Sequence, residues 1–367
     1  MGGQVTRIAW RPFSVPFVVP LATATGSWAI RDGFIVELET ADGFIGVGEA
    51  SPLPGVPLSE VRNALADYAS AALSLDIEEV WNRATTATAC PTAAFGVELA
   101  VASAAAARRG WPLHRFLGSV RTRAIPVNGL IDATGIDAAV EKARSLMGQG
   151  HHTVKMKVGG AADADIARIR AVRDVIGPAI ALRIDANGGW DEGTAAEVLA
   201  AAARSGVSLC EQPVPPGSEA PDAFARLTSA GVPLAADESC RSVIAMRPFV
   251  DKEAISAVVV KPMLTGLREG AAMLELARDS GIEAIVTTTF DVGVGVLGAM
   301  HLAATLPDPL PACGLATLNL LTHPLVTGAP SVSGGFVDLP GGGGIGVSLD
   351  RVALDRFATG PWTEVRA

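Results

Sequence analysis

Six polar residues follow short apolar runs at nearly constant intervals along this 367-residue chain. They are Lys157, Asp185, Glu211, Asp237, Lys261 and Thr288, separated by 28, 26, 26, 24 and 27 residues. If each run is a strand of a parallel barrel, these side chains meet at its carboxyl-terminal end, where barrel enzymes gather their reactive groups. Polar residues also mark the ends of strands without function, but that alternative accounts for one or two of them better than for six in register.

Three of these residues are acids at the ends of consecutive inferred strands, namely Asp185, Glu211 and Asp237. Carboxylates brought so close together repel and raise one another's pKa, and a divalent cation removes that repulsion. An all-oxygen site with open positions favours Mg²⁺, and Mn²⁺ accepts the same ligands. The sequence therefore predicts a Mg²⁺ or Mn²⁺ site, although each acid alone fits a solvated strand end or a helix N-cap equally well.

Lysines flank the acids on both sides. Lys155 and Lys157 lie in the sequence KMK, where the period-2 alternation of a strand turns both toward one face and Met156 toward the other. Lys261 ends the apolar run AVVV, an unusual context for a solvated lysine. Burial and a nearby metal both lower a lysine's pKa, which would provide a general base near neutral pH. Lysines that merely pair with the acids are the alternative, and such pairing would also orient them for catalysis.

A cation and a lysine facing one centre fit the removal of a proton α to a carboxylate, because the metal neutralises charge that develops on the enediolate. None of the five histidines falls at the end of an inferred barrel strand, which leaves lysine as the base. A non-catalytic scaffold or metal-binding module is a hypothesis of another class. It predicts that at least one of these lysines or acids is missing, and all are present.

The pattern of residue types along the chain indicates the helices and strands that position these residues. Residues 4–50 alternate as strands and contain an Asp42-Gly43 turn, which predicts an antiparallel hairpin. Residues 59–118 are rich in alanine and leucine at helical spacing. From Ala124 onward, β-branched runs alternate with amphipathic stretches that end in glycine, which predicts repeated βα units on a parallel sheet.

The composition excludes several classes of partner. A net charge of −9, a pI near 5.1 and the lack of any Lys/Arg run disfavour nucleic acid and anionic membrane surfaces. The four cysteines are widely spaced without a CxxC pair, and the N-terminus has no signal-peptide pattern, so we expect a reduced cytoplasmic protein. No apolar segment is long enough to cross a bilayer. Composition carries no signal for an oligomeric state.

The motifs KMK, RIDAN, CEQP, ADES and KPMLTG, in this order, resemble the muconate-lactonizing branch of the enolase superfamily over nearly the whole chain. Within that branch the chain is most similar to o-succinylbenzoate synthases, through RDGF at 31–34, Arg183, TTTFDVGVG and CGLATLNLL. The resemblance implies an α/β fold with a (β/α)₇β modified TIM barrel at residues 121–325. It also implies an α+β capping domain formed by residues 1–120 and completed by a C-terminal tail, residues 326–367.

The resemblance further implies roles for individual residues. Lys157 would remove the α proton and return it to the departing hydroxyl, Lys155 would support the lowered pKa of Lys157, and Lys261 would stabilise the enediolate. The implied metal ligands are Asp185, Glu211 and Asp237. The implied substrate contacts are Arg31, Arg183, Asn187, Thr287 and Gly314, with a loop at 21–31 that covers the substrate.

The implied activity is the syn dehydration of a small-molecule carboxylate, 2-succinyl-6-hydroxy-2,4-cyclohexadiene-1-carboxylate, to o-succinylbenzoate in menaquinone biosynthesis. An N-succinylamino acid racemase is the alternative, because it shares the scaffold, the metal and both lysines. The chain departs from the family in having three threonines at 287–289 where serines are common, and Phe290-Asp291 where Ile-Glu is common. The segment ATLNLL lacks the Asp-x-Asp of dipeptide epimerases, which counts against that activity.

Overall fold

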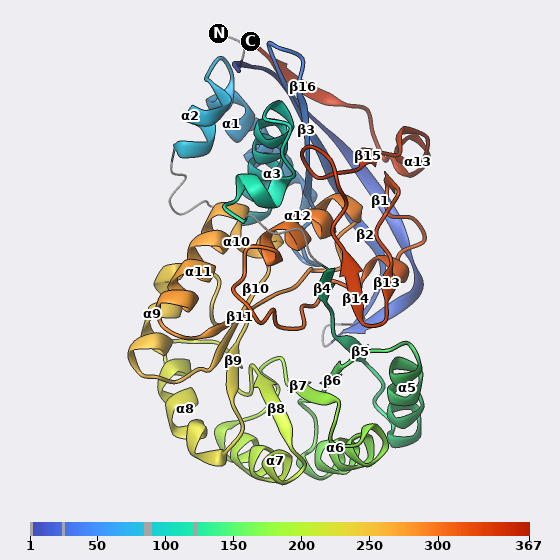
Figure 1. Cartoon of the computed structure of the whole chain (residues 1–367), viewed down its shortest axis with the longest axis vertical. Coiled ribbons are helices and arrows are strands. Elements are labelled where there is room, and N and C mark those ends of the chain that lie inside the picture. The colour runs from blue at the N-terminus through green and yellow to red at the C-terminus, as the bar shows by residue number, and fades with distance from the viewer. Residues whose placement is uncertain (1–2, 24–25, 84–89, 120–123) are drawn as a thin grey trace.

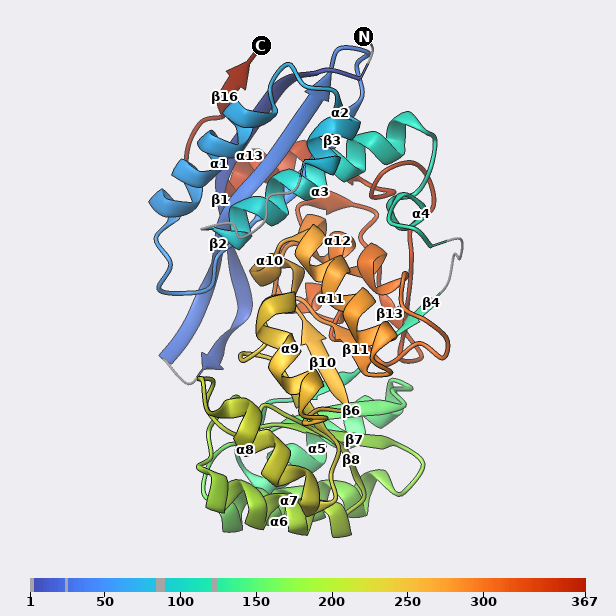
Figure 2. The same cartoon turned by 90° about the vertical axis from the view of Figure 1, so that its left-hand side faces the viewer.

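The protein is an α/β structure in which a curled parallel sheet, wrapped by helices, lies under an N-terminal α+β domain (Figure 1). The computed structural model describes residues 3–23, 26–83, 90–119 and 124–367. The first and last strands of the chain both belong to the N-terminal domain, at the top of both views (Figures 1 and 2).

An antiparallel sheet in the order β16-β1-β2-β3 forms the N-terminal domain. Its strands are β1 (Val5–Thr23), β2 (Gly26–Thr40), β3 (Ile45–Ala50) and β16 (Thr363–Arg366). The predicted hairpin is confirmed at the Asp42-Gly43 turn between β2 and β3, where Gly43 has φ +83°. The last strand of the chain pairs with the first, with Ile8 opposite Val365, so the C-terminal tail completes this sheet. The exact domain boundaries stay a prediction.

Helices cover one face of this sheet. They are α1 (Leu58–Ala72), α2 (Ile77–Asn82), α3 (Pro91–Arg108) and α4 (Leu113–Phe116). The alanine-rich helix α3 approaches β3 so closely that a Cβ on Gly48 would lie 1.8 Å from the carbonyl oxygen of Gly96. A Cβ on Gly46 would likewise lie 1.9 Å from Ala100 O. Glycines on the strand and small residues on the helix therefore allow α3 to be buried between the sheet and the barrel helices.

The second sheet is parallel and has seven strands in sequential order, as the repeated βα texture predicts. The strands are β5 (Gly129–Ile131), β6 (Thr153–Lys157), β7 (Ala181–Asp185), β8 (Val207–Glu211), β9 (Leu234–Ala236), β10 (Ala257–Val260) and β11 (Glu283–Val286). The helices around them are α5 (Ile136–Gly148), α6 (Ala162–Ile176), α7 (Glu192–Arg204), α8 (Ala220–Leu227), α9 (Val243–Asp251), α10 (Pro262–Thr265), α11 (Leu267–Asp279) and α12 (Gly293–Ala303).

A short bridge, and not a full eighth strand, joins the two edges of this sheet. Gly314 N–H donates to Val286 O of β11 at 3.0 Å, and Cys313 N–H donates to Pro126 O, ahead of β5, at 2.8 Å. The resemblance implies a complete strand here. Proline has no N–H to donate to a ladder, which limits strand formation in the segment before Cys313. Its prolines are Pro307, Pro309 and Pro311.

Smaller elements complete the chain. They are η1 (Thr228–Ala230), η2 (Leu318–Leu320), β4 (Ala124–Pro126), β12 (Val326–Thr327), β13 (Val332–Ser333), β14 (Phe336–Asp338), β15 (Ser348–Leu349) and α13 (Arg351–Phe357). Strand β4 pairs with β14 of the tail, which ties the start of the barrel to the C-terminal segment. None of the described helices has both the length and the apolar character that spanning a bilayer requires.

The alternation along the barrel strands decides which side chains face inward. On β6, Val154 and Met156 are fully buried against the outer helices, so Lys155 and Lys157 point into the barrel. Two residues below the polar strand ends, the interior holds a separate apolar cluster. Its members are Leu209, Ala235, Ala257, Val259 and Ile285. This apolar floor closes the barrel beneath the charged layer, so water reaches that layer from the carboxyl-terminal end.

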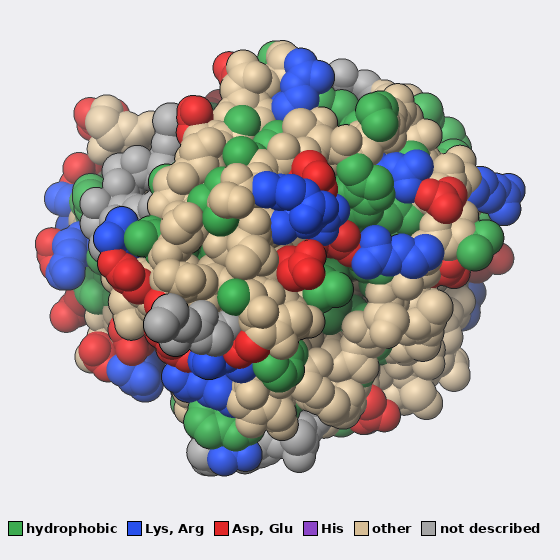
Figure 3. Space-filling model, turned by 90° about the horizontal axis from the view of Figure 1, so that it is seen from above, with side chains coloured by type: hydrophobic (Ala, Val, Ile, Leu, Met, Phe, Trp, Pro, Cys, Tyr) green, Lys and Arg blue, Asp and Glu red, His purple; other side chains and the backbone are tan. Residues whose placement is uncertain are grey.

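Seen from the end that carries the N-terminal domain, the surface intermixes Lys/Arg and Asp/Glu side chains (Figure 3). The mixed pattern fits a moderate net charge of −9 on a chain of this size. It gives that face no basic stripe of the kind that tracks a phosphate backbone.

Two buried histidines join α12 to α4 and to the tail. Nδ1 of His301 lies 3.2 Å from both the backbone N–H and Nδ1 of His114, and the two rings stack with centroids 5.4 Å apart. Nε2 of His301 lies 3.3 Å from Ile345 O. Burial lowers the pKa of His301 to about 4, against the opposing hydrogen bond to Ile345. A neutral His301 is therefore part of the folded state.

This pair predicts a loss of stability in mild acid. The unfolded chain binds the proton near pH 6.5 and the folded chain only near pH 4, so the unfolded state holds more protons between these values. The free energy of unfolding should then fall by roughly 1 kcal/mol per pH unit in this window as the pH decreases. Urea unfolding of wild type and His301→Asn at pH 7 and pH 5 measures this, since Asn keeps an acceptor for the His114 N–H. Equal pH dependence in the two proteins would contradict the assignment.

Candidate active site

The inward-facing residues at the carboxyl-terminal end of the barrel form one charged layer. Strand register places Lys157 beside Asp185, and Asp185 beside Glu211. Asp237 directly follows β9, and Lys261 directly follows β10. The parallel strands thus bring together residues that are up to about 100 positions apart in the chain, as their spacing predicts.

Ion pairs connect the layer. Lys155 Nζ lies 2.9 Å from Asp185 Oδ2 and 2.7 Å from Glu211 Oε2. Lys157 Nζ also contacts Asp185 Oδ2, at 2.7 Å, and Lys261 Nζ pairs with Asp237. Each acid is at most 5% exposed, so these pairs lie in a poorly solvated environment where charge interactions are strong.

Burial and neighbouring charges shift the pKa values in opposite directions. Burial raises the pKa of Glu211 to about 8, and the charge of Asp185 adds to this. For Asp185, burial is outweighed by Lys155 and Lys157, which hold its pKa well below the usual value. Burial likewise opposes the charged forms of Lys155 and Lys261, but the neighbouring acids raise the pKa of both lysines. In this arrangement the amines of Lys155 and Lys261 are protonated. A lysine of this layer becomes available as a general base only when another cation neutralises the acids beside it.

The donor set fits a divalent cation. Glu211 Oε1 is buried without a hydrogen-bond partner, and so is Glu238 Oε2 next to Asp237 in the sequence. The four carboxyl groups of Asp185, Glu211, Asp237 and Glu238 outnumber the three lysines here, and the two unpartnered oxygens are acceptors that a cation would use. As the side chains stand, no three His, Cys, Asp or Glu residues in the described part of the chain are grouped for metal binding. The ammonium groups instead occupy carboxylate oxygens that a cation would need.

Asn187 links Lys157 to Glu238. Lys157 Nζ donates to Asn187 Oδ1 at 2.6 Å, and Asn187 Nδ2 donates to Glu238 Oε1 at 2.9 Å. Asn187 has φ +46°, a left-handed conformation that asparagine tolerates better than most residues. Asn187 was predicted as a substrate contact. Its contacts here orient the lysine, and its side chain is exposed.

A cavity of about 590 Å³ opens beside this layer. The predicted residues Lys155, Lys157, Lys261, Thr287 and Gly314 all line it. A Cβ at position 314 would lie 2.5 Å from Thr287 Oγ1, so glycine is required there for Thr287 to keep its place.

Arg31 and Arg183 lie away from the lining of this cavity. Arg31 is fully buried between β2 and the loop after β11, with Asp291 as its ion-pair partner at 3.1 Å. Arg183 crosses the barrel interior one layer below Asp185 and donates to Ala312 O at 2.7 Å. Both arginines are therefore in contact with protein groups that hold the barrel end together, and their predicted contact with substrate stays a prediction.

The sequence reasoning missed three features of the site. Glu238 was hidden within ADES, where only Asp237 was read as functional. His151 lines the cavity although it precedes its strand, and its Nδ1 lies 3.1 Å from Val127 O. Phe290, noted only as a departure from the family, also lines the cavity and has φ +62°. A non-glycine residue in that conformation is a structural signal that sequence alone does not carry.

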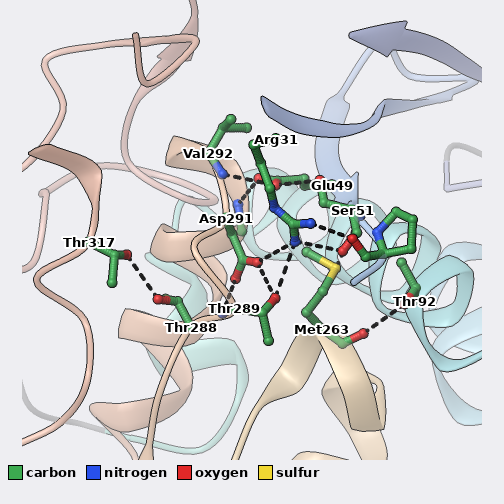
Figure 4. Close-up of polar contacts among 12 residues, drawn as sticks. Arg31, Glu49, Ser51, Thr92, Met263, Thr288, Thr289, Asp291, Val292 and Thr317 are labelled. Atoms are coloured by element: carbon green, nitrogen blue, oxygen red, sulfur yellow. Dashed lines mark hydrogen bonds and ion pairs between the residues drawn. The ribbon is translucent and has the colours of Figure 1, made fainter. Parts of the chain in front are cut away.

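The N-terminal domain contacts the segments that follow the barrel strands (Figure 4). Ser51 N–H donates to Met263 Sδ at 3.2 Å, and Thr92 Oγ1 donates to Met263 O at 3.1 Å. Met263 is two residues beyond Lys261, so these bonds fix the backbone that carries the lysine.

Comparison with known proteins agrees with this architecture. Residues 138–353 match the family Enolase C-terminal domain-like, and residues 7–118 match the N-terminal domain of mandelate racemase / muconate lactonizing enzyme. The two matches cover the barrel and the N-terminal domain respectively.

Two curated relatives have different activities. An o-succinylbenzoate synthase of Thermobifida fusca (strain YX) is 39% identical over 220 residues, 59% of this chain. That match spans 65% of the relative's own length, less than two thirds. A hydrophobic dipeptide epimerase of Enterococcus faecalis is 29% identical over 360 residues, which are 94% of this chain and 99% of the relative.

Solved structures share the fold. The N-succinyl Arg/Lys racemase from Bacillus cereus superposes with a TM-score of 0.90 at 24% identity, covering 99% of this chain and 100% of that one. The dipeptide epimerase from Enterococcus faecalis, complexed with Mg and L-Leu-L-Tyr, gives a TM-score of 0.85 at 25% identity over 94% and 99% of the two chains. A structural relative of this protein thus binds Mg.

The unpartnered oxygen of Glu211 generates a prediction about metal binding. Glu211→Gln should weaken Mg²⁺ binding by at least ~10-fold, because it removes an anionic oxygen that a hard cation requires. Calorimetric titration with MgCl₂ alone measures the affinity. Glu192→Gln is the matched control, since that acid on α7 is exposed and pairs with Arg226 at 2.6 Å. Unchanged affinity in Glu211→Gln would remove Glu211 from the proposed ligand set.

Proposed function

The chain belongs to the enolase superfamily, in the branch of mandelate racemase and muconate lactonizing enzyme, and we propose that it is an o-succinylbenzoate synthase. One observation carries the substrate class. The charged side chains that line the cavity are four lysines and a single acid, Asp132; the lysines are Lys142, Lys155, Lys157 and Lys261. Lys155, Lys157 and Lys261 pair with the acids of the charged layer. With a divalent cation on those acids, the lining would carry the positive charge that suits a substrate with two carboxylates, as 2-succinyl-6-hydroxy-2,4-cyclohexadiene-1-carboxylate has.

The excess of lysines counts against a dipeptide as substrate. A dipeptide carries an ammonium group that needs an acceptor, and the lining around the bridge is neutral or apolar at residues 315–320. The similarity to a curated o-succinylbenzoate synthase supports the finer assignment.

In the proposed reaction Lys157 takes the proton from the carbon α to the ring carboxylate, and the C–H electron pair passes into an enediolate. The enediolate collapses to a new ring double bond as the C–O bond to the hydroxyl breaks. Lys157 returns its proton to that hydroxyl on the same face of the ring. Water departs, and the product ring is aromatic. Asn187 Oδ1 accepts a hydrogen bond from Lys157 Nζ at 2.6 Å. This bond fixes the orientation of the ammonium group that returns the proton to the hydroxyl.

Lys261 lies across the cavity and contributes positive charge to the enediolate without exchanging a proton. Lys155 and Lys157 contact the same oxygen of Asp185, so Lys155 helps to hold that carboxylate beside the proposed base. Asp185, Glu211 and Asp237 are the proposed ligands of Mg²⁺, with Mn²⁺ as the possible substitute. When bound, the metal would neutralise charge on the enediolate, as is typical of enolase-superfamily sites.

A racemase of N-succinylamino acids is the second candidate, because such substrates also carry two carboxylates and the two lysines lie in one cavity. In that reaction Lys157 and Lys261 would exchange protons with opposite faces of one carbon. The two activities therefore require different chemistry from Lys261.

Removing the proposed base should abolish turnover while leaving the fold intact. Lys157→Ala is expected to lower kcat by ~10²- to 10⁴-fold, the usual contribution of a general base. Mg²⁺ affinity and thermal unfolding should stay near wild type. Lys252→Ala is the control, since that lysine pairs with Asp222 on the exposed surface. Retention of more than about a tenth of wild-type kcat would move the base elsewhere.

Lys261→Arg separates the two reactions. A guanidinium stays protonated, so it can stabilise an enediolate electrostatically but cannot accept a proton. We expect this variant to keep part of its dehydratase activity and to lose racemisation completely.

The wild-type enzyme should also prefer dehydration to racemisation in kcat/KM, measured for both substrates on one preparation. Each tenfold preference corresponds to about 1.4 kcal/mol of transition-state discrimination. Racemisation faster by tenfold would overturn the synthase assignment but keep the enolate mechanism.

A further inference from the structure

A buried polar cluster ties the N-terminal sheet to the loop that follows β11. Figure 4 shows Arg31 of β2 and Glu49 of β3 pointing toward Asp291 and its neighbours in that loop. Arg31 and Glu49 are 0% exposed and Asp291 is 1% exposed. None of the three residues has a role in the proposed chemistry.

The Arg31 guanidinium is fixed from both sides. Its Nη2 donates to Asp291 Oδ1 at 3.1 Å and to Thr289 Oγ1 at 3.2 Å. Its remaining hydrogen bonds go to backbone carbonyls of the N-terminal domain, those of Ser51 at 2.7 Å and of Pro52. The planar fork of an arginine can make such contacts in two directions at once, which a lysine cannot.

Glu49 holds the same loop at its other end. Its Oε1 accepts from Val292 N–H at 2.9 Å, and its Oε2 accepts from Gly295 N–H at 2.7 Å. These are backbone donors at the start of α12, where an acidic side chain is favoured by the helix dipole. The N-terminal sheet thus fixes residues 289, 291 and 292 of the loop and residue 295 in the first turn of α12.

Phe290 lies between Thr289 and Asp291, the two loop residues that Arg31 contacts. Its φ of +62° is an unfavourable conformation for an aromatic residue, so its surroundings must hold it there. Its ring lines the cavity and meets Phe17 at 6.1 Å and Trp28 at 5.8 Å, both edge-to-face. Phe17 and Trp28 come from the β1–β2 hairpin, so this aromatic cluster also spans the two domains.

We infer that Arg31 and Asp291 are positioning residues, which hold Phe290 in its left-handed conformation so that its ring forms an apolar wall of the substrate cavity. The identity of the ring that packs on this wall rests on the proposed function, but the placement of Phe290 does not. Phe290 determines specificity for carboxylates that carry a planar apolar group, and the ion pair acts on the substrate only through Phe290.

Stability alone explains the pair poorly. Replacing a buried ion pair with well-packed apolar residues is often neutral or stabilising, whereas removal of one partner leaves a costly unpaired charge. A double substitution can therefore separate a structural role from a positioning role.

The experiment compares Arg31→Met, Asp291→Leu and the double variant with wild type. Both single variants should lose stability, and the double variant should regain most of it. If the pair positions Phe290, the KM of the double variant for the cyclohexadiene carboxylate should remain at least ~10-fold above that of wild type, as expected for a disturbed apolar pocket. Its kcat should change far less. Phe290→Leu should reproduce that raised KM. If the double variant does not fold, Arg31→Lys, which keeps the charge, replaces it in the same KM measurement.

Arg7→Met is the control for loss of an arginine ion pair in the same sheet, because Arg7 pairs with Glu364 at 2.6 Å and makes no contact with this loop. It should leave KM unchanged. A double variant with wild-type stability and wild-type KM would show that the pair does not position Phe290, and would overturn the inference.

A readout without turnover separates this inference from the proposed function. The Trp28–Phe290 contact contributes to near-ultraviolet circular dichroism, and Trp28→Phe and Phe290→Leu supply reference spectra. The Arg31 guanidinium also lies 5.0 Å over the Trp28 ring, so Asp291→Leu, which keeps that arginine, is the informative variant. It should lose the same signal as Phe290→Leu. If it does so in a protein that has no dehydratase activity, the proposed function fails and the positioning role stands. If its spectrum is that of wild type, the positioning role fails whatever the activity.

Discussion

The compensation of buried charge at the carboxyl-terminal end of the barrel is the constraint on which the rest of the structure depends. Carboxylates at most 5% exposed cannot stay ionised together unless cations stand beside them. Lys155 is shared between Asp185 and Glu211, and Lys261 pairs with Asp237. The lysines that serve catalysis in the proposal are therefore also those that make the acid cluster possible. One oxygen of Glu211 has no hydrogen-bond partner even so.

The barrel satisfies this constraint by layering. On β8 and at β10, inward-facing positions alternate between an apolar residue below and a charged residue above, as in Leu209 and Glu211 or Val259 and Lys261. The apolar floor keeps water from one side and raises the energetic cost of an unpaired charge above it. Open space remains on the other side, where the cavity lies. Solvent access and substrate access are thus confined to the same opening.

The N-terminal domain completes the site by contacts with backbone that follows the strands. Hydrogen bonds from Ser51 and Thr92 hold Met263, just beyond Lys261, while Arg31 and Glu49 hold the loop after β11. These bonds are made by residues that are distant in sequence from the segments they fix. A change in the sheet of one domain is therefore transmitted to the cavity wall of the other through a few buried polar contacts.

The elements of this protein that follow from periodicity can be predicted from its sequence. Constant spacing identified the strands, and the alternation in KMK correctly turned both lysines inward, because in both cases the information is local. The tertiary structure alone decided which groups pair. The motif around Arg31 does not indicate its partner Asp291, which is 260 residues away. The motif ADES does not indicate that one oxygen of Glu238 is buried without a partner. The left-handed backbone of Phe290 was equally invisible, because it is imposed by anchors on another domain and not by the residue itself.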